Sequence, residues 1–211
     1  MFSSTADFFA QIAILLPAFL VSLSFHEFFH AFIAYLCGDD TAKRQGRMTI
    51  NPIAHVDLFG LLCLLLFRIG WAKPVPFDNR NFKYPRLYSV FTALAGPFAN
   101  FLLALILFYA MAYFPINLFS NPFIAITFLQ ILEATAYVNI MLGVFNLLPI
   151  PPLDGSHVIT MLLINRYPRF VFWLHQYSFI ILLILIFLTP TRIFLMHMIQ
   201  IAEVILRSLV F

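Results

Sequence analysis

The chain has 211 residues, of which 63% are hydrophobic and only 10% are charged. A soluble domain carries about 25% charged residues, so this composition excludes an ordinary soluble protein and indicates an all-α polytopic membrane protein. The formal net charge of +3 comes from basic residues between apolar runs. We expect this charge to set the membrane orientation rather than to bind nucleic acid.

Long apolar runs predict the membrane-spanning helices, because about 20 apolar residues are needed to cross a bilayer. Four stretches reach this length, and they cover residues 8–37, 88–114, 122–148 and 170–188. A fifth stretch, residues 193–211, is apolar but contains Gln200, Glu203 and Arg207. We predict that it also spans, with an amphipathic helix in the membrane interface as the alternative.

Residues 58–70 form a shorter apolar segment within the connection 41–86. Apolar segments of about 10–14 residues are more often re-entrant than spanning. Basic residues flank the segment on both sides, and the positive-inside rule places both groups in the cytoplasm only if the chain enters the membrane and returns. We therefore predict a re-entrant segment, about five to six transmembrane helices in all, and one intramembrane domain over residues 1–211.

The most informative motif, His26-Glu27-Phe28-Phe29-His30, lies inside the first predicted span. His26 and His30 project from one face of a helix, close enough to share a metal ion, while Glu27 points toward a metal-bound water. Three ionisable side chains are costly in hydrocarbon unless they face protein or a water-filled cavity. A rise of about 1.5 Å per residue places the motif toward the cytoplasmic side of the membrane.

A catalytic zinc ion takes three protein ligands and keeps a fourth position for water. Asp154 is the best candidate for the third ligand, because it follows the third predicted span at the depth of the two histidines. Three prolines just before Asp154 prevent a regular helix there. Unwound backbone at membrane depth is tolerated where it lines a cavity or is buried in protein. We therefore predict one Zn²⁺ per chain.

Several motifs and their order resemble the site-2 protease family of intramembrane zinc metalloproteases (peptidase family M50), in its compact prokaryotic form without PDZ or CBS domains. The resemblance covers nearly the whole chain. It rests on the segments 26–30, 46–47, 51–55, 71–76, 95–100 and 146–155.

The resemblance implies that His26, His30 and Asp154 are zinc ligands, that Glu27 is the general base and that Asn146 binds or polarises the scissile carbonyl. Members cleave the membrane-spanning segment of a substrate, commonly after another protease has trimmed its outer part. The resemblance also implies a small membrane-associated β-hairpin within 41–86. An exposed edge along 73–77 would hold an unwound substrate through main-chain hydrogen bonds.

His55 and His157 are assigned supporting roles, near the ligands or the substrate. The predicted function is hydrolysis of a peptide bond within or near the transmembrane segment of a protein or peptide in the lipid bilayer. We expect a multi-pass protein of the cell membrane with its active site toward the cytoplasm, and we assign no oligomeric state. Two alternatives are a metal transporter or channel, for which Glu27 has no evident use, and an inactive homologue that serves as a scaffold.

Overall fold

The computed structural model describes residues 5–67, 70–115 and 119–211. Four helices in these ranges are long and apolar enough to cross a membrane. They are α1 (Thr5–Leu36, of which Gln11–Leu36 qualifies), α4 (Pro85–Tyr113), α5 (Pro122–Asn146) and α7 (Pro168–Phe187). The four longest apolar runs of the sequence are thus confirmed as helices, and the protein is a multi-pass membrane protein of all-α class.

Local signals in the sequence explain where the long helices begin and end. Proline is the first residue of α4, α5 and α7, a position where its missing N–H costs nothing. The side chain of Asn121 caps α5 by accepting a hydrogen bond from the Phe123 N–H (2.9 Å). At the other end of α1, Gly38 takes a positive φ of 105°, as the residue after a helix C-terminus commonly does.

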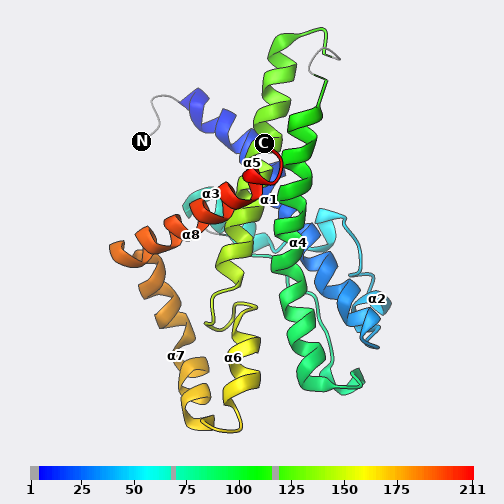
Figure 1. The fold of residues 1–211 in the computed structure, drawn as a ribbon, viewed down its shortest axis with the longest axis vertical. Coiled ribbons are helices and arrows are strands. Elements are labelled where there is room, and N and C mark those ends of the chain that lie inside the picture. Colours follow the sequence, from blue (N-terminus) through cyan, green and yellow to red (C-terminus); the bar gives the residue numbers. More distant parts are fainter. Residues whose placement is uncertain (1–4, 68–69, 116–118) are drawn as a thin grey trace.

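Helices α1, α4 and α5 pack against one another and form the centre of the molecule (Figure 1). Small residues line their contacts, among them Ala18, Ala104 and Ala136, all fully buried. Small side chains let membrane helices approach closely, since dispersion replaces the hydrophobic drive in lipid. This three-helix centre carries the polar residues described below.

The connection between α1 and α4 contains α2 (Thr41–Arg44), α3 (Leu58–Phe67) and two short 3₁₀ turns, Pro52–Ala54 and Asn79–Asn81. Helix α3 has 10 residues and is therefore about 15 Å long, half the thickness of the hydrocarbon layer. Its Leu64 packs against the α1–α5 contact. The prediction that 58–70 re-enters stays a prediction, and residues 68–69 of that segment lie outside the described residues.

The predicted β-hairpin is wrong for the described part of this connection. The residues described between α1 and α4 contain one isolated antiparallel bridge, between Val56 and Ala72, and no strand. Pro74 and Pro76 lack the N–H groups that a ladder needs. The apolar run at 58–67, predicted as part of a re-entrant segment, forms a helix.

Buried Asp39 ties this connection to the end of α1. Its carboxylate accepts hydrogen bonds from the backbone N–H of Asp78 (2.7 Å), the side chain of Asn81 (2.7 Å) and the N–H of Thr41 (3.1 Å). Burial raises the pKa of Asp39, but these hydrogen bonds outweigh it and hold the pKa below its usual value. Asp39 therefore stabilises the fold as an ionised group.

We expect the contribution of Asp39 to be complete above its unfolded pKa of about 3.9, and to disappear as the pH falls through the lower folded pKa. Asp39→Asn should lower the free energy of unfolding by about 1–3 kcal/mol at pH 7 and flatten the acid limb of the stability curve. Thermal unfolding from pH 3 to pH 7 measures both effects. Asp40→Asn is the matched control, because its side chain is 48% exposed; equal curves for the two variants would refute the assignment.

The C-terminal part contains α6 (Ser156–Leu163), α7 and α8 (Thr189–Ser208). The predicted count of five to six spans is not supported, since α8 fails the requirement for an apolar run and four candidates remain among the described residues. Helix α8 turns back from α7 and crosses the bundle toward α4 and α5 (Figure 1). Its Arg207 pairs with Glu203 (2.9 Å) and with Glu133 of α5 (3.0 Å), which explains why these charges interrupt an otherwise apolar helix.

Candidate metal centre

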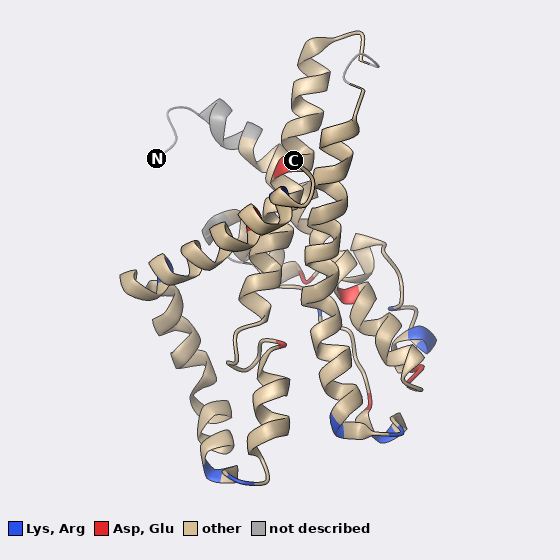
Figure 2. Cartoon of the chain, in the orientation of Figure 1, with Lys and Arg blue, Asp and Glu red and all other residues tan. Residues whose placement is uncertain are grey.

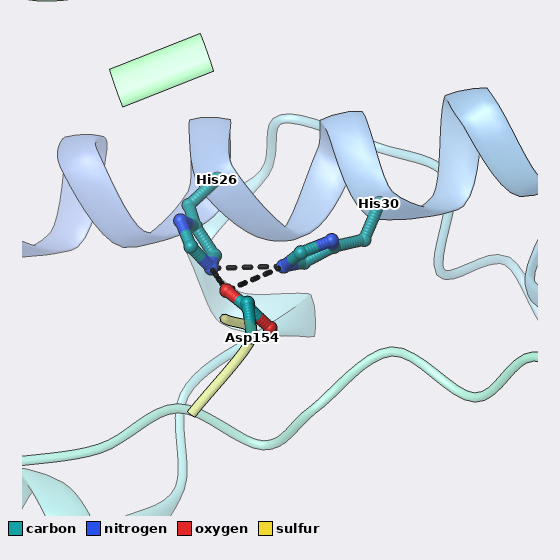
Figure 3. Close-up of side chains that lie close together, drawn as sticks. All are labelled: His26, His30 and Asp154. Carbon is teal, nitrogen blue, oxygen red and sulfur yellow. Dashed lines mark hydrogen bonds and ion pairs between the residues drawn. The ribbon is translucent and has the colours of Figure 1, made fainter. Parts of the chain in front are cut away.

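Two histidines of α1 and one aspartate from the loop after α5 converge inside the bundle (Figure 3). The Nε2 atoms of His26 and His30 lie 2.9 Å apart. Asp154 Oδ2 lies 3.1 Å from the first and 3.4 Å from the second. Both histidines are buried, and the Asp154 side chain is 20% exposed. The three residues predicted as metal ligands are therefore brought together.

Hydrogen bonds at the far side of each ring determine which nitrogen carries the proton. His26 Nδ1 lies 2.6 Å from Asn100 Oδ1, and the Asn100 amide nitrogen donates to Asn139 Oδ1 (2.7 Å), so the oxygen faces the ring. His30 Nδ1 lies 2.7 Å from the Thr92 carbonyl oxygen, which can only accept. Each Nδ1 is therefore the donor, and each Nε2 presents a lone pair to the cluster.

Three electron-rich atoms thus point at one another in a buried place. Asp154 Oδ2 is buried and has no hydrogen-bond partner within the described ranges, and such an orphaned oxygen is costly. A divalent cation among the three atoms removes the repulsion. With metal–ligand distances of about 2.0–2.1 Å, ligand atoms of a tetrahedral zinc site lie about 3.3 Å apart, close to the separations observed here. The nitrogen and oxygen donors suit zinc.

The backbone near the site leaves room only for glycine at two positions. A Cβ built on Gly96 of α4 would lie 2.6 Å from His26 Nε2, so α4 can approach both imidazoles only because this side chain is missing. A Cβ on Gly155 would collide with the Leu147 backbone. The Gly155 N–H donates to the Asn146 carbonyl (2.7 Å), and this bond folds the loop so that Asp154 faces α1.

Glu27 is buried beside the two histidines but is separate from the cluster of three ligand atoms. Its Oε2 accepts a hydrogen bond from the backbone N–H of Val75 (2.8 Å). The side chain therefore meets the segment 71–77, which returns to α1 after α3. The sequence contained no signal for this contact, because a backbone N–H carries no residue identity.

The predicted edge along 73–77 has few free backbone donors. The Lys73 N–H donates to the His55 carbonyl (2.9 Å), the Val75 N–H donates to Glu27, and Pro74 and Pro76 have no N–H. Residues 73–76 thus offer a substrate strand no unused backbone donor. Pairing of a substrate strand with this segment would therefore depend on its carbonyl oxygens, and it stays a prediction.

The remaining predicted residues are not among the three clustered ligand atoms. Asn146 donates from Nδ2 to the Leu142 carbonyl (3.1 Å), one turn back on its own helix. His55 is fully buried, with Nε2 2.8 Å from the Thr49 carbonyl oxygen. The His157 ring stands 6.1 Å from the Phe77 ring. Burial lowers the pKa of His157, and the nearby Asp154 only partly opposes this.

One group of buried polar residues near the metal site was not among the predicted site residues. Asn100, Asn139 and Ser22 are fully buried and join α4, α5 and α1. Asn100 also donates to the Ser22 carbonyl (3.2 Å), and Asn139 donates to the Ser22 hydroxyl (2.7 Å). Polar side chains in apolar spans were the available signal, since they are expected to find partners across helices.

The helices long enough to cross a membrane, the HExxH motif and the aspartate that converges on its two histidines are typical of a membrane-embedded zinc metalloprotease. The family model described as "Peptidase family M50" matches residues 114–188. The chain is 41% identical over 177 residues to "Putative zinc metalloprotease YwhC" of Bacillus subtilis (strain 168), which covers 81% of this chain and 78% of the relative. The chain therefore belongs to peptidase family M50, the site-2 protease family, and is a zinc metalloendopeptidase.

Two further relatives extend the comparison. The chain is 32% identical over 182 residues to "Putative zinc metalloprotease Rip2" of Mycolicibacterium smegmatis, covering 84% of this chain and 67% of the relative. It is 26% identical over 155 residues to "Zinc metalloprotease MJ0392" of Methanocaldococcus jannaschii, covering 74% of this chain and 36% of that protein. No solved structure matches the chain.

Proposed function

We propose that this chain hydrolyses a peptide bond within or near the transmembrane segment of membrane-protein substrates. In this proposal His26, His30 and Asp154 hold the zinc ion, and Glu27 is the general base. The convergence of two imidazole lone pairs and an orphaned carboxylate oxygen, between helices that can cross a membrane, carries the proposal. Membership of a metalloprotease family does not favour the transporter, channel or scaffold alternatives.

The chemistry follows from the residues around the metal. Zinc, when bound, lowers the pKa of its water toward about 7 and polarises a carbonyl group. Glu27 accepts the proton of the attacking water and passes it to the leaving amine. The Val75 N–H occupies Oε2 of Glu27, so Oε1 is the oxygen assigned to this proton transfer. The Asn100 and Thr92 oxygens keep the histidine Nε2 atoms unprotonated.

Asn146 is proposed to bind the scissile carbonyl. It is the last residue of α5, directly before the loop that carries Asp154, and its amide donates to its own helix. Rotation of the side chain would free Nδ2 for the carbonyl oxygen, where a neutral donor stabilises developing negative charge. His55 and His157 are proposed to support the site from the connection and from α6.

The active site is proposed to lie toward the cytoplasm. Lys and Arg residues gather at the end of the molecule formed by α2, the start of α4 and the α6–α7 connection (Figure 2). Cytoplasmic loops carry an excess of these residues. His26 and His30 lie in the last third of α1, which leads into α2, and Asp154 lies between the end of α5 and the start of α6, so hydrolysis would release a fragment on the cytoplasmic side.

Removal of zinc tests the proposed activity directly. We expect purified protein in lipid nanodiscs to cleave a fluorogenic single-span substrate, to lose cleavage after treatment with a chelator, and to regain it when Zn²⁺ is added back. Activity that persists at a zinc content below one tenth of an ion per chain, measured by mass spectrometry, would exclude the zinc mechanism. A substrate cut only outside its apolar segment would exclude intramembrane cleavage.

A further inference from the structure

The base Glu27 is held by a segment that is itself unusually constrained. Segment 71–77 contains no helix, and Val75 stands between Pro74 and Pro76. Each proline fixes its own φ and restricts the residue before it. The Val75 N–H is thus the single donor of residues 74–76, and it points at Glu27 Oε2 over 2.8 Å.

The Val75 side chain fixes the same residue from another direction. It is 8% exposed and packs with Ala31 and Ala42 in a small buried cluster, with Met48 against it. Ala31 lies one turn beyond Glu27 on α1, so the side chain and the N–H of Val75 both contact the helix that carries the base. The position of the donor is therefore coupled to the connection that follows α1.

Arg47 clamps the backbone just before Val75. Its Nη2 donates to the carbonyl oxygens of Lys73 (2.7 Å) and Pro74 (3.3 Å). The Arg47 N–H donates to the Ala42 carbonyl (2.8 Å), and Gly46 before it takes a φ of 68°, a left-handed turn that favours glycine. A guanidinium that serves two successive carbonyls fixes the path of the chain better than a point charge does.

We propose that Arg47 is a positioning residue for the catalytic base. It holds the carbonyls of Lys73 and Pro74, this fixes the Val75 N–H, and the N–H orients the Glu27 carboxylate so that one oxygen remains for the water. The inference rests on the proposed role of Glu27 in hydrolysis. It assigns a function to the Gly46-Arg47 and Lys73-Pro74-Val75-Pro76 segments, which neither bind the metal nor form the predicted hairpin.

The test compares Arg47→Met and Arg47→Lys with Arg44→Met in zinc-loaded, full-length protein. Arg44 is the matched control, because it lies on the same connection, is 66% exposed and pairs only with Asp40 within the described ranges. We expect Arg47→Met to lower kcat about 10- to 100-fold, as misplacement of a catalytic group by about 1 Å does. KM and zinc content should stay within about two-fold, Arg47→Lys should recover part of the loss, and Arg44→Met should match wild type.

A second readout does not depend on cleavage. Hydrogen exchange of the Val75 amide should be slow in wild type and Arg44→Met, and at least about ten-fold faster in Arg47→Met and in Glu27→Ala, because each change releases the donor. If wild type cleaves no substrate but shows this exchange pattern, the proposed function is refuted, while the positioning of the Val75 N–H by Arg47 is supported. Slow exchange of the Val75 amide in Arg47→Met, or an unchanged kcat, would refute the proposed positioning role of Arg47.

Replacing Val75 with its α-hydroxy acid covers the case in which Arg47→Met fails to fold. The ester removes only the N–H and leaves the side chain in its cluster. We expect kcat to fall about ten-fold or more with zinc retained. An ester variant that cleaves at the wild-type rate would show that Glu27 needs no such donor.

Discussion

Glu27→Gln is expected to abolish cleavage while the zinc content stays near one ion per chain. Glutamine has nearly the volume of glutamate, and its Oε1 can still accept the Val75 N–H that now reaches the carboxylate over 2.8 Å. It cannot accept a proton from water. A positioned general base is worth about 10²–10⁴ in rate, so kcat should fall by at least about two orders of magnitude with little change in KM.

The matched control for this prediction is Glu133→Gln, the same chemical change on α5. Glu133 pairs with Arg207, and its side chain is 61% exposed, so its loss should leave cleavage within about two-fold of wild type. Zinc is counted by mass spectrometry, and cleavage is followed on a single-span substrate. If Glu27→Gln retains more than a tenth of the wild-type rate, Glu27 is not the base; if it loses zinc, Glu27 helps to hold the metal.

The features of this site that are determined within a single helix or a single loop could be predicted from the sequence. The spacing of His26 and His30 determines that both rings share a helix face, whatever surrounds the helix. Asp154 could be found at a long distance in sequence because few polar residues lie at that membrane depth. Proline-marked starts and a glycine end explain why the long helices were predicted within a few residues of their actual bounds.

The parts that were missed depend on how elements pack together. The sequence alone does not reveal how α4 is rotated about its axis relative to α1. The hydrogen bonds of Asn100 and Thr92 to individual histidines therefore could not be predicted. The β-hairpin was inferred from relatives, and prolines at 74 and 76 remove the donors it needs in this chain. Helix α8 was predicted to span the membrane because most of its residues are apolar. The prediction could not include the ion pair between Arg207 of α8 and Glu133 of α5, which depends on how the two helices pack.

Asp154→Asn is expected to change stability in opposite directions with and without zinc. In the metal-free protein, at a pH high enough for both imidazoles to be neutral, Asp154 Oδ2 faces two imidazole lone pairs at 3.1 Å and 3.4 Å and has no other partner among the described residues. An asparagine can turn its amide nitrogen toward those lone pairs and donate to one of them. At that pH the metal-free variant should therefore be more stable than metal-free wild type by about 1 kcal/mol.

With zinc bound, wild type should be more stable than Asp154→Asn. A ligand that binds only the folded state adds RT ln(1 + [L]/Kd), about 4 kcal/mol at a thousand-fold excess over Kd. The neutral amide is a poor zinc ligand, so most of this gain should be lost in Asp154→Asn together with cleavage. Thermal unfolding of both proteins, with chelator and with Zn²⁺, measures this change in the order of their stabilities. A variant that is less stable than wild type in both conditions would mean that Asp154 stabilises the bundle by itself; zinc-dependent stabilisation equal to that of wild type would remove Asp154 from the ligand set.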